Sequence, residues 1–311
     1  MIYGSGDYTY ELVSGWAEVS EGESFRDVGG VRVDEEDRVL VLNRSGRPVM
    51  VFDATGERLS SWGDDYFSDR PHGLGLDAEG NVYCTDDGNH TVRKFTPDGE
   101  LLLTLGTEDE PAETGYRHDA PDLFERIASI TRGAGPFNGP TGVAVSASGE
   151  IFVADGYGNA RVHAFDPDGE HLRSWGQPGP APGEFRLPHS IYCDGEDRLW
   201  VTDRENSRIQ VFDTSGELVA EWTDLIRPTD VVVDDAVFVS ELCRRVSVFT
   251  ADGELLTRWG NERHPTDDPL FVAPHAIAVD SNGDLYVGEV SYTYKGIDRG
   301  PRAIQKFERR D

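Results

Sequence analysis

Residues 141–176 read TGVAVSASG, EIFVADGYGNA, RVHAFDPDG and EHLRSWG, four short segments that are separated by turns. Apolar and polar residues alternate in RVHAF (161–165), which is the period of two expected of a half-buried antiparallel strand. The turns carry Ser-Gly or Asp-Gly pairs, which permit tight hairpins. We therefore expect four antiparallel strands here, the last of which ends in Trp-Gly.

The same arrangement recurs along the whole chain. Repeats open near Gly30, His72, Thr141, His189, Thr229 and His275, and residues 107–138 form an insertion in the second. Repeats of this length with four short strands each are typical of a β-propeller. We predict an all-β, six-bladed β-propeller that forms one domain over residues 1–311. The N-terminal segment 8–19 is expected to supply the outermost strand of the last blade, which closes the ring and protects its edges.

Three of the six repeats open with a histidine that follows a proline. The segments are RPHGLGLD (70–77), LPHSIYCD (187–194) and APHAIAVD (273–280). They belong to repeats two, four and six, which lie about 120° apart around the axis of a six-bladed propeller. His72, His189 and His275 should therefore converge on one point, which is the three-histidine arrangement of an open metal site.

Two arginines and one tyrosine are further candidates. Arg44 and Arg204 both directly follow the end of a second strand, in repeats one and four, which face each other in a six-bladed ring. Guanidinium groups bind carboxylates through two parallel hydrogen bonds, so we expect the pair to hold a substrate carboxylate. Repeat three inserts Tyr157 between two glycines. We expect a flexible, open turn there and Tyr157 as a general base. Surface salt bridges and a rim aromatic without a chemical role are the alternatives.

Other polar and aromatic residues are interpreted as structural. Asp86, Asp203 and Glu289 each follow a histidine by fourteen positions, and Asp155 has the same place in repeat three. We expect these acids to accept backbone N–H groups at blade turns. The tryptophans that end the repeats should pack between blades. The other histidines, read as surface or turn residues, are His90, His118, His163, His171 and His264.

Composition limits the classes of partner. The net charge is −29, and a surface this acidic repels nucleic acid and anionic membranes. No apolar run approaches the length of a membrane span, and the N-terminus does not resemble a signal peptide. The three cysteines share no metal or redox spacing, so buried free thiols are the simplest interpretation of Cys84 and Cys193. We expect a cytoplasmic monomer that acts on a small, carboxylate-bearing molecule.

The segments VADGYGNARV (153–162) and TDRENSRIQVF (202–212), together with the Pro-His segments, resemble the NHL-repeat propellers, and among these the peptidyl-α-hydroxyglycine α-amidating lyases. The resemblance implies that the three histidines hold a catalytic zinc. It also implies that Tyr157 is the active-site tyrosine and that Arg44 and Arg204 are the two active-site arginines.

The same resemblance implies a structural calcium on the backbone carbonyls of Val31 and Leu74. Ala276 replaces the acid that follows the third histidine in the family, which argues against calcium because a hard cation favours carboxylate oxygens. Ala273 stands where the family has a methionine, so the wall of the pocket is expected to be wider.

These observations favour a metal-dependent carbon–nitrogen lyase. Its substrate would be an N-acyl-α-hydroxyglycine or a related α-hydroxy acid, cleaved to an amide and glyoxylate. Zinc suits three imidazoles, but iron, cobalt and manganese accept the same ligands. A metal-dependent hydrolase of the lactonase kind and a non-catalytic NHL scaffold are the alternatives.

Overall fold

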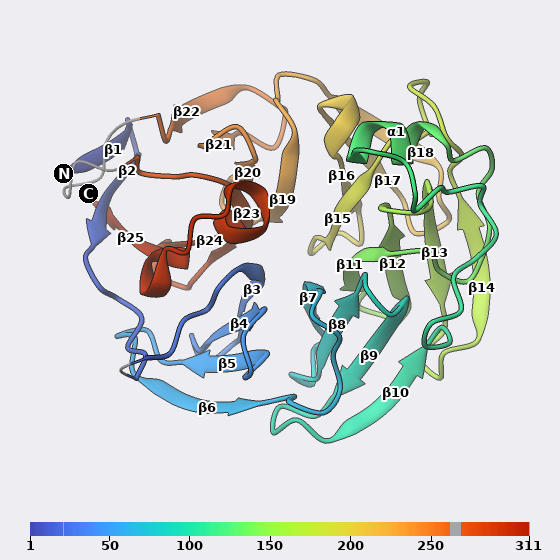
Figure 1. The fold of residues 1–311 in the computed structure, drawn as a ribbon. Coiled ribbons are helices and arrows are strands. Elements are labelled where there is room, and N and C mark those ends of the chain that lie inside the picture. The colour runs from blue at the N-terminus through green and yellow to red at the C-terminus, as the bar shows by residue number, and fades with distance from the viewer. Residues whose placement is uncertain (21, 262–268, 311) are drawn as a thin grey trace. The chain divides into compact units, whose positions relative to one another are not determined.

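The computed structural model describes residues 1–20, 22–261 and 269–310 (Figure 1). It confirms the predicted all-β fold: the strands form six antiparallel sheets, the blades of a six-bladed propeller. The contacts between residues divide the chain into two compact units, 67–228 and 1–66 with 229–311. Each unit is described by itself.

Residues 67–228 form three four-stranded sheets. The first contains β7 (Pro71–Leu76), β8 (Val82–Asp86), β9 (Thr91–Phe95) and β10 (Leu101–Leu105). The second contains β11 (Pro140–Val145), β12 (Ile151–Asp155), β13 (Arg161–Phe165) and β14 (His171–Trp175). The third contains β15 (Pro188–Cys193), β16 (Leu199–Asp203), β17 (Arg208–Phe212) and β18 (Leu218–Trp222), with the short helix η1 (Arg204–Asn206) after β16.

The inner strands of this unit are buried on both faces, which corrects the expectation of half-buried strands. Every residue of β17 is buried, and in β13 only Arg161 is partly exposed. The reason is that side chains of neighbouring blades cover both faces: Phe152 and Val162 of one blade share a cluster with Phe212 of the next. Burial of each phenylalanine stabilises the fold by about 1.5–3 kcal/mol. Exposed residues occur mainly in outer strands such as β14 and β18.

Residues 1–66 and 229–311 form the other three sheets. One contains β3 (Val28–Val33), β4 (Val39–Asn43), β5 (Val49–Phe52) and β6 (Arg58–Trp62). Another contains β19 (Pro228–Val233), β20 (Val237–Glu241), β21 (Arg245–Phe249) and β22 (Leu255–Trp259). The last contains β23 (Pro274–Val279), β24 (Leu285–Glu289), β25 (Ile304–Arg310), β2 (Tyr8–Val13) and β1 (Ile2–Ser5), with α2 (Ser291–Lys295) and η2 (Gly300–Ala303) between β24 and β25.

The N-terminal strand joins the C-terminal strand, as predicted for ring closure. β2 pairs with β25 over five positions, from Thr9 opposite Arg310 to Val13 opposite Lys306, and Figure 1 shows both termini at this sheet. The sequence did not predict β1, which pairs with β2 and makes this sheet five-stranded. The tryptophans pack between blades, as expected. The ring centroid of Trp175 lies 5.8 Å from that of Phe212 in the next blade, and the ring of Trp259 stacks on that of Tyr10 with their centroids 5.1 Å apart.

The insertion contains one helix, α1 (Leu123–Ala128). Its first turn is capped by Asp122, whose Oδ1 accepts a hydrogen bond from the backbone N–H of Glu125 at 2.9 Å, the usual way in which an open helix N-terminus is satisfied. This helix was not predicted from the sequence, although its apolar residues have helical spacing; only Ile127 of its six residues is buried.

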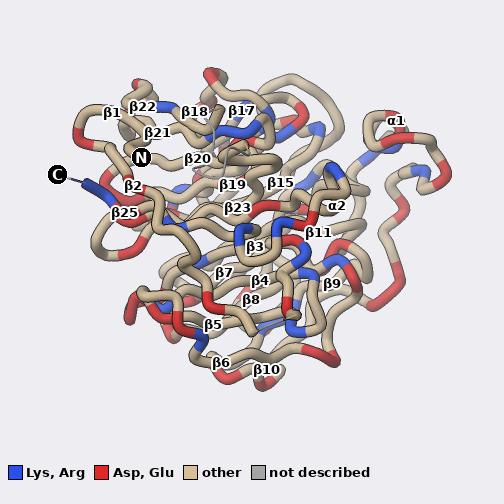
Figure 2. The backbone as a smooth tube through the Cα atoms, turned by 60° about the vertical axis from the view of Figure 1, so that its left-hand side comes forward, with Lys and Arg blue, Asp and Glu red and all other residues tan. Residues whose placement is uncertain are grey.

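Acidic positions outnumber basic ones along the described backbone (Figure 2). Within the described residues, no helix is both long enough and apolar enough to span a bilayer. The Cys84 thiol is buried and unpaired, as predicted, whereas Cys193 is half-buried. Burial, together with the carboxylates of Asp197 and Asp194, raises the pKa of Cys193 to about 12.

Candidate metal centre and active site

Each predicted metal ligand is the second residue of the innermost strand of its blade. His72 follows Pro71, the first residue of β7; His189 follows Pro188, the first residue of β15; and His275 follows Pro274, the first residue of β23. The pairing register shifts at this point in each of the three strands. All three imidazoles are at most 3% exposed. The three histidines have equivalent positions in their blades because the Pro-His pair opens repeats two, four and six at the same place.

Backbone carbonyls hold two of the imidazole rings. His72 Nδ1 lies 2.7 Å from the carbonyl oxygen of Thr141, and His275 Nδ1 lies 2.9 Å from that of Gly29. A carbonyl oxygen only accepts hydrogen bonds, so Nδ1 carries a proton in both rings, and in the neutral form of each ring Nε2 keeps its lone pair. A hydrogen bond from Nδ1 to a backbone carbonyl normally orients a histidine that binds a metal through Nε2.

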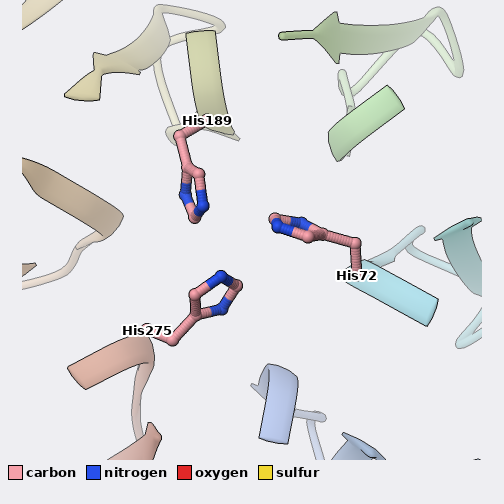
Figure 3. Close-up of side chains that lie close together, drawn as sticks. All are labelled: His72, His189 and His275. Atoms are coloured by element: carbon pink, nitrogen blue, oxygen red, sulfur yellow. The ribbon is translucent and has the colours of Figure 1, made fainter. Parts of the chain in front are cut away.

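The three imidazoles form one buried group (Figure 3). Their ligating nitrogens all lie within 4.8 Å of one another, so the three histidines could hold a metal ion. Three nitrogens that share an ion at about 2.1 Å in a tetrahedral site lie about 3.4 Å apart. The gaps between the donors would therefore have to close by at most about 1.4 Å for all three to bind one ion. Among the described residues the group consists of three buried imidazoles and no carboxylate, a donor set that fits a transition metal better than calcium or magnesium.

Tyr157 lies beside two of these histidines in the unit of residues 67–228. Its hydroxyl oxygen is 3.4 Å from His72 Nε2, and its ring centroid lies 6.0 Å from that of His189. Because the proton of His72 is on Nδ1, the phenol is the donor in this contact. The geometry places an oxygen that can exchange a proton next to a nitrogen that can bind a metal.

The turn that carries Tyr157 is packed, contrary to the expectation of an open and flexible one. A Cβ atom on Gly156 would lie 2.0 Å from the carbonyl oxygen of Pro188, and one on Gly158 would lie 2.1 Å from the side chain of Asn138. The glycines are therefore required by the close approach of neighbouring chain segments. This packing fixes the position of Tyr157.

Arg204 contacts Tyr157 directly. Its Nη1 donates a hydrogen bond to the Tyr157 hydroxyl oxygen at 3.2 Å, and its Nε donates to Glu205 at 2.9 Å. The side chain is 3% exposed. Burial alone would lower the pKa of Arg204, but the Tyr157 oxygen and the Glu205 carboxylate raise it, so the guanidinium stays charged. Arg204 therefore places a positive charge beside the Tyr157 hydroxyl oxygen.

Arg44 belongs to the other unit, where it is also buried. Its Nη1 lies 3.5 Å from the Asp27 carboxylate and donates a hydrogen bond to Thr293 Oγ1 at 3.1 Å. Asp27 in turn accepts the N–H groups of Tyr292 and Thr293, so it ties α2 to the start of β3. This arrangement holds the arginine in a fixed position. Its proposed contact with substrate stays a prediction.

The four acids at the ends of second strands are structural, as predicted. Each acid accepts hydrogen bonds from backbone N–H groups that precede its blade. Asp86 accepts from Ser68, and Asp155 accepts from Asn138. Asp203 accepts from Arg186 and Leu187, and Glu289 accepts from Val272 and Ala273. Each acid thus holds the segment that leads into its own blade. In three of these four blades this segment leads to a histidine of the metal group.

Known proteins share this architecture and much of this sequence. The NHL repeat family matches residues 137–165 and 185–212, the segments that carry Tyr157, His189 and Arg204. The chain is an NHL-repeat propeller. It is homologous to peptidyl-alpha-hydroxyglycine alpha-amidating lyase 1 of Drosophila melanogaster, at 38% identity over 171 residues, 51% of this chain and 28% of that protein. NHL repeat-containing protein 3 of Mus musculus is 32% identical over 234 residues, 70% of this chain and 60% of that protein.

This NHL-repeat propeller spans less than two thirds of the length of the curated relatives that it matches. A solved structure described as a streptogramin B lyase superposes with a TM-score of 0.60 over 98% of this chain and 99% of that one, at 16% sequence identity. At that identity the likeness supports the fold alone.

The calcium donors implied by the resemblance do not fit this NHL-repeat propeller. Arg32 Nη1 donates a hydrogen bond to the carbonyl oxygen of Val31 at 2.8 Å and pairs with Asp230 at 2.9 Å, and it lies 3.4 Å from the carbonyl oxygen of Ile277. A guanidinium is permanently charged and repels a second cation. The Arg32 guanidinium therefore already lies at the Val31 carbonyl oxygen, where a calcium ion would have to bind. The Leu74 donor belongs to the other unit.

Sequence reasoning missed two charged residues near Tyr157. The Arg70 guanidinium lies 5.7 Å from the centre of the Tyr157 ring and pairs with Asp87, with Nη2 and Oδ2 2.9 Å apart. Asp87 raises the pKa of Arg70. Glu205 holds Arg204. Both residues lie close in sequence to predicted ones: Arg70 comes two positions before His72, and Glu205 comes one position after Arg204. This proximity is the sequence feature from which they could have been predicted.

One other histidine differs from its predicted place, and one cannot be compared. His163 was read as a surface or turn residue, but it lies in β13 at 1% exposure and contacts Ser174 and Asp155. Its ring points to the buried interior because the third strand is covered on both faces. His264 lies outside the described residues.

Proposed function

We propose that the protein is a metal-dependent lyase that cleaves N-acyl-α-hydroxyglycines to an amide and glyoxylate. The observation that carries the proposal is the combination of three convergent imidazoles with Tyr157, whose hydroxyl lies 3.4 Å from His72 Nε2 and 3.2 Å from Arg204 Nη1. Homology to the fly lyase supports the same reaction class.

The three histidines would hold the metal, zinc being the simplest choice for three imidazoles. When bound there, it would supply Lewis acidity toward the substrate hydroxyl. His72 and His275 are held for this task by their Nδ1 hydrogen bonds.

Tyr157 would move the proton. Its own proton would first leave to solvent, since the positive charges of Arg204 and of a bound metal favour the phenolate form. The phenolate oxygen would then accept the proton of the substrate hydroxyl, the electron pair of that O–H bond would form the carbonyl of glyoxylate, and the C–N bond would break with its electrons on nitrogen. Return of the proton from Tyr157 to that nitrogen gives the neutral amide, so no other reactant is consumed. Such a positioned acid–base group typically contributes 10²–10⁴-fold to the rate.

Arg204 would serve both Tyr157 and the substrate. Its Nε and Nη1 are taken by Glu205 and Tyr157, while Nη2 has no hydrogen bond to any residue in the described ranges, so it can donate to a substrate carboxylate. Arg44 is proposed as a second carboxylate anchor, and orientation of this kind lowers the entropic part of the barrier.

Turnover of α-hydroxyhippurate tests the proposal. The wild-type protein should release benzamide and glyoxylate, and Tyr157→Phe should lower kcat by about 10²–10⁴-fold. Equal rates would remove tyrosine from the mechanism, and no glyoxylate from the wild type would contradict the substrate class. In oxygen-18 water the amide should stay unlabelled, whereas labelled benzoate would indicate a hydrolase.

A further inference from the structure

The unit of residues 67–228 contains a cavity of about 510 Å³ between the insertion and the blade that carries His189. Its lining includes Phe124, Ile127 and Ala128 of α1, together with Pro178 and Phe185. Cavities of this size bury most of a small organic ligand. The walls are mainly apolar.

Three residues of the cavity wall connect it to the candidate active site. Ala160 follows Tyr157 by three positions, Arg186 precedes His189 by three, and Glu205 directly follows Arg204. The connection is also physical, because Glu205 binds the guanidinium that contacts the Tyr157 hydroxyl. A ligand in the cavity therefore lies close to the segments that carry the reacting groups.

The insertion is fastened to the turn of Tyr157. Thr114 Oγ1 donates a hydrogen bond to the carbonyl oxygen of Gly158 at 2.6 Å, and the Gly158 N–H donates to the carbonyl oxygen of Asn138 at 2.7 Å. The segments that flank α1 on both sides thus contact the residue after Tyr157. The cavity wall and the proposed base are held by the same contacts.

The charges on the wall favour an uncharged apolar ligand group. Burial alone would raise the pKa of Glu205, but Arg204 and Arg227 lower it, so its negative charge is matched by two cations. Arg186 lies at the exposed rim. Phe124, although apolar, is 61% exposed on α1, a side chain that a bound ligand could cover.

We infer that this cavity is a specificity site that binds the acyl group of the substrate, with a preference for medium-length alkyl or aromatic acyl chains. The inference rests on the proposed function, since it assigns the acyl half of the same substrate. The carboxylate and hydroxyl of the substrate would remain at Arg204 and Tyr157 while the acyl group lies against α1.

Binding of N-acylglycines tests the cavity without catalysis, because these molecules lack the hydroxyl group that the reaction needs. Calorimetry with acetyl-, butyryl-, hexanoyl- and octanoylglycine should show dissociation constants that fall roughly two- to fourfold per added methylene. Ala128→Trp should fill the cavity from an exposed position and abolish this gain. Phe124→Ala should reduce it. Ala147→Trp, an exposed alanine of the same unit outside the cavity wall, is the matched control and should keep it.

A dissociation constant that does not depend on chain length in the wild type, or an unchanged gain in Ala128→Trp, would overturn the inference. Glyoxylate release from N-acetyl-α-hydroxyglycine separates this outcome from a failure of the proposed function. If the wild type and Ala147→Trp both cleave this short substrate, the function stands whatever the binding series shows. If neither cleaves any acyl substrate but binding still strengthens with chain length, the function fails and the cavity assignment stands.

Discussion

Replacement of Arg204 by methionine tests whether this side chain acts in the reaction or only in the fold. Methionine keeps much of the volume of the buried side chain and removes the charge. Arg204 makes two charge-assisted hydrogen bonds, to Glu205 at 2.9 Å and to Tyr157 at 3.2 Å. Bonds of this kind contribute about 1.5–3 kcal/mol each, and removal of one partner of a buried ion pair costs about 3–5 kcal/mol. We therefore expect a loss of about 3–5 kcal/mol in the free energy of unfolding.

Arg227→Met is the matched control. Arg227 is the second cation on Glu205, at 2.7 Å, and no contact joins it to Tyr157 within the described residues. Both variants should therefore be less stable, Arg227→Met by about 1.5–3 kcal/mol. Only Arg204→Met should also lower kcat/KM, by about 30- to 1000-fold, which corresponds to about 2–4 kcal/mol of transition-state binding.

The assay is glyoxylate release from α-hydroxyhippurate, measured well below the melting temperature of each variant, together with urea unfolding. If the two variants lose activity to the same extent, or if Arg204→Met loses stability but keeps its activity, Arg204 acts through the fold and has no part in the reaction.

Two further predictions concern calcium and the thiols. Arg32 already places a positive charge at the Val31 carbonyl. Millimolar calcium, or a chelator selective for calcium, should therefore change the melting temperature by less than about 1 °C. A calcium-induced rise of several degrees would show that the ion binds. The pKa of Cys193 is raised to about 12, so its reactive thiolate is scarce at pH 8 and becomes about tenfold more abundant per pH unit up to that value. Alkylation by iodoacetamide, followed by peptide mass spectrometry, should be about a thousandfold slower at pH 8 than for an ordinary cysteine, and a rate close to that of free cysteine would contradict the burial of this thiol.

The repeat made most of the fold predictable. The predicted blade openings at His72 and His189 lie one residue inside β7 and β15, because apolar segments and Gly-containing turns recur at the same positions. The two-sided burial of β13 and β17 was not predicted. It arises from packing between blades, and the alternation within one strand does not report which neighbour covers it.

The candidate site was predictable only in part. The Pro-His pair occurs in every second repeat, and this pattern indicated the convergence of the three imidazoles. Equivalent positions in the blades of a closed propeller all face the same axis. The contact of Tyr157 with Arg204 joins residues 47 positions apart and depends on the packed turn at Gly156 and Gly158. The contact of Arg32 with Asp230 joins residues 198 positions apart. No local pattern encodes such pairs, because they follow from which turns lie next to each other after folding.

Metal content is the most direct measure of the central claim. Protein purified without a histidine tag should contain about one equivalent of a divalent transition metal by elemental mass spectrometry, and His189→Ala should contain less than about a fifth of an equivalent. His118→Ala, a substitution at an exposed histidine outside the group, should keep the metal. Wild-type protein with less than about half an equivalent, or a His189→Ala variant that binds as much metal as His118→Ala, would contradict a metal centre built from these three side chains.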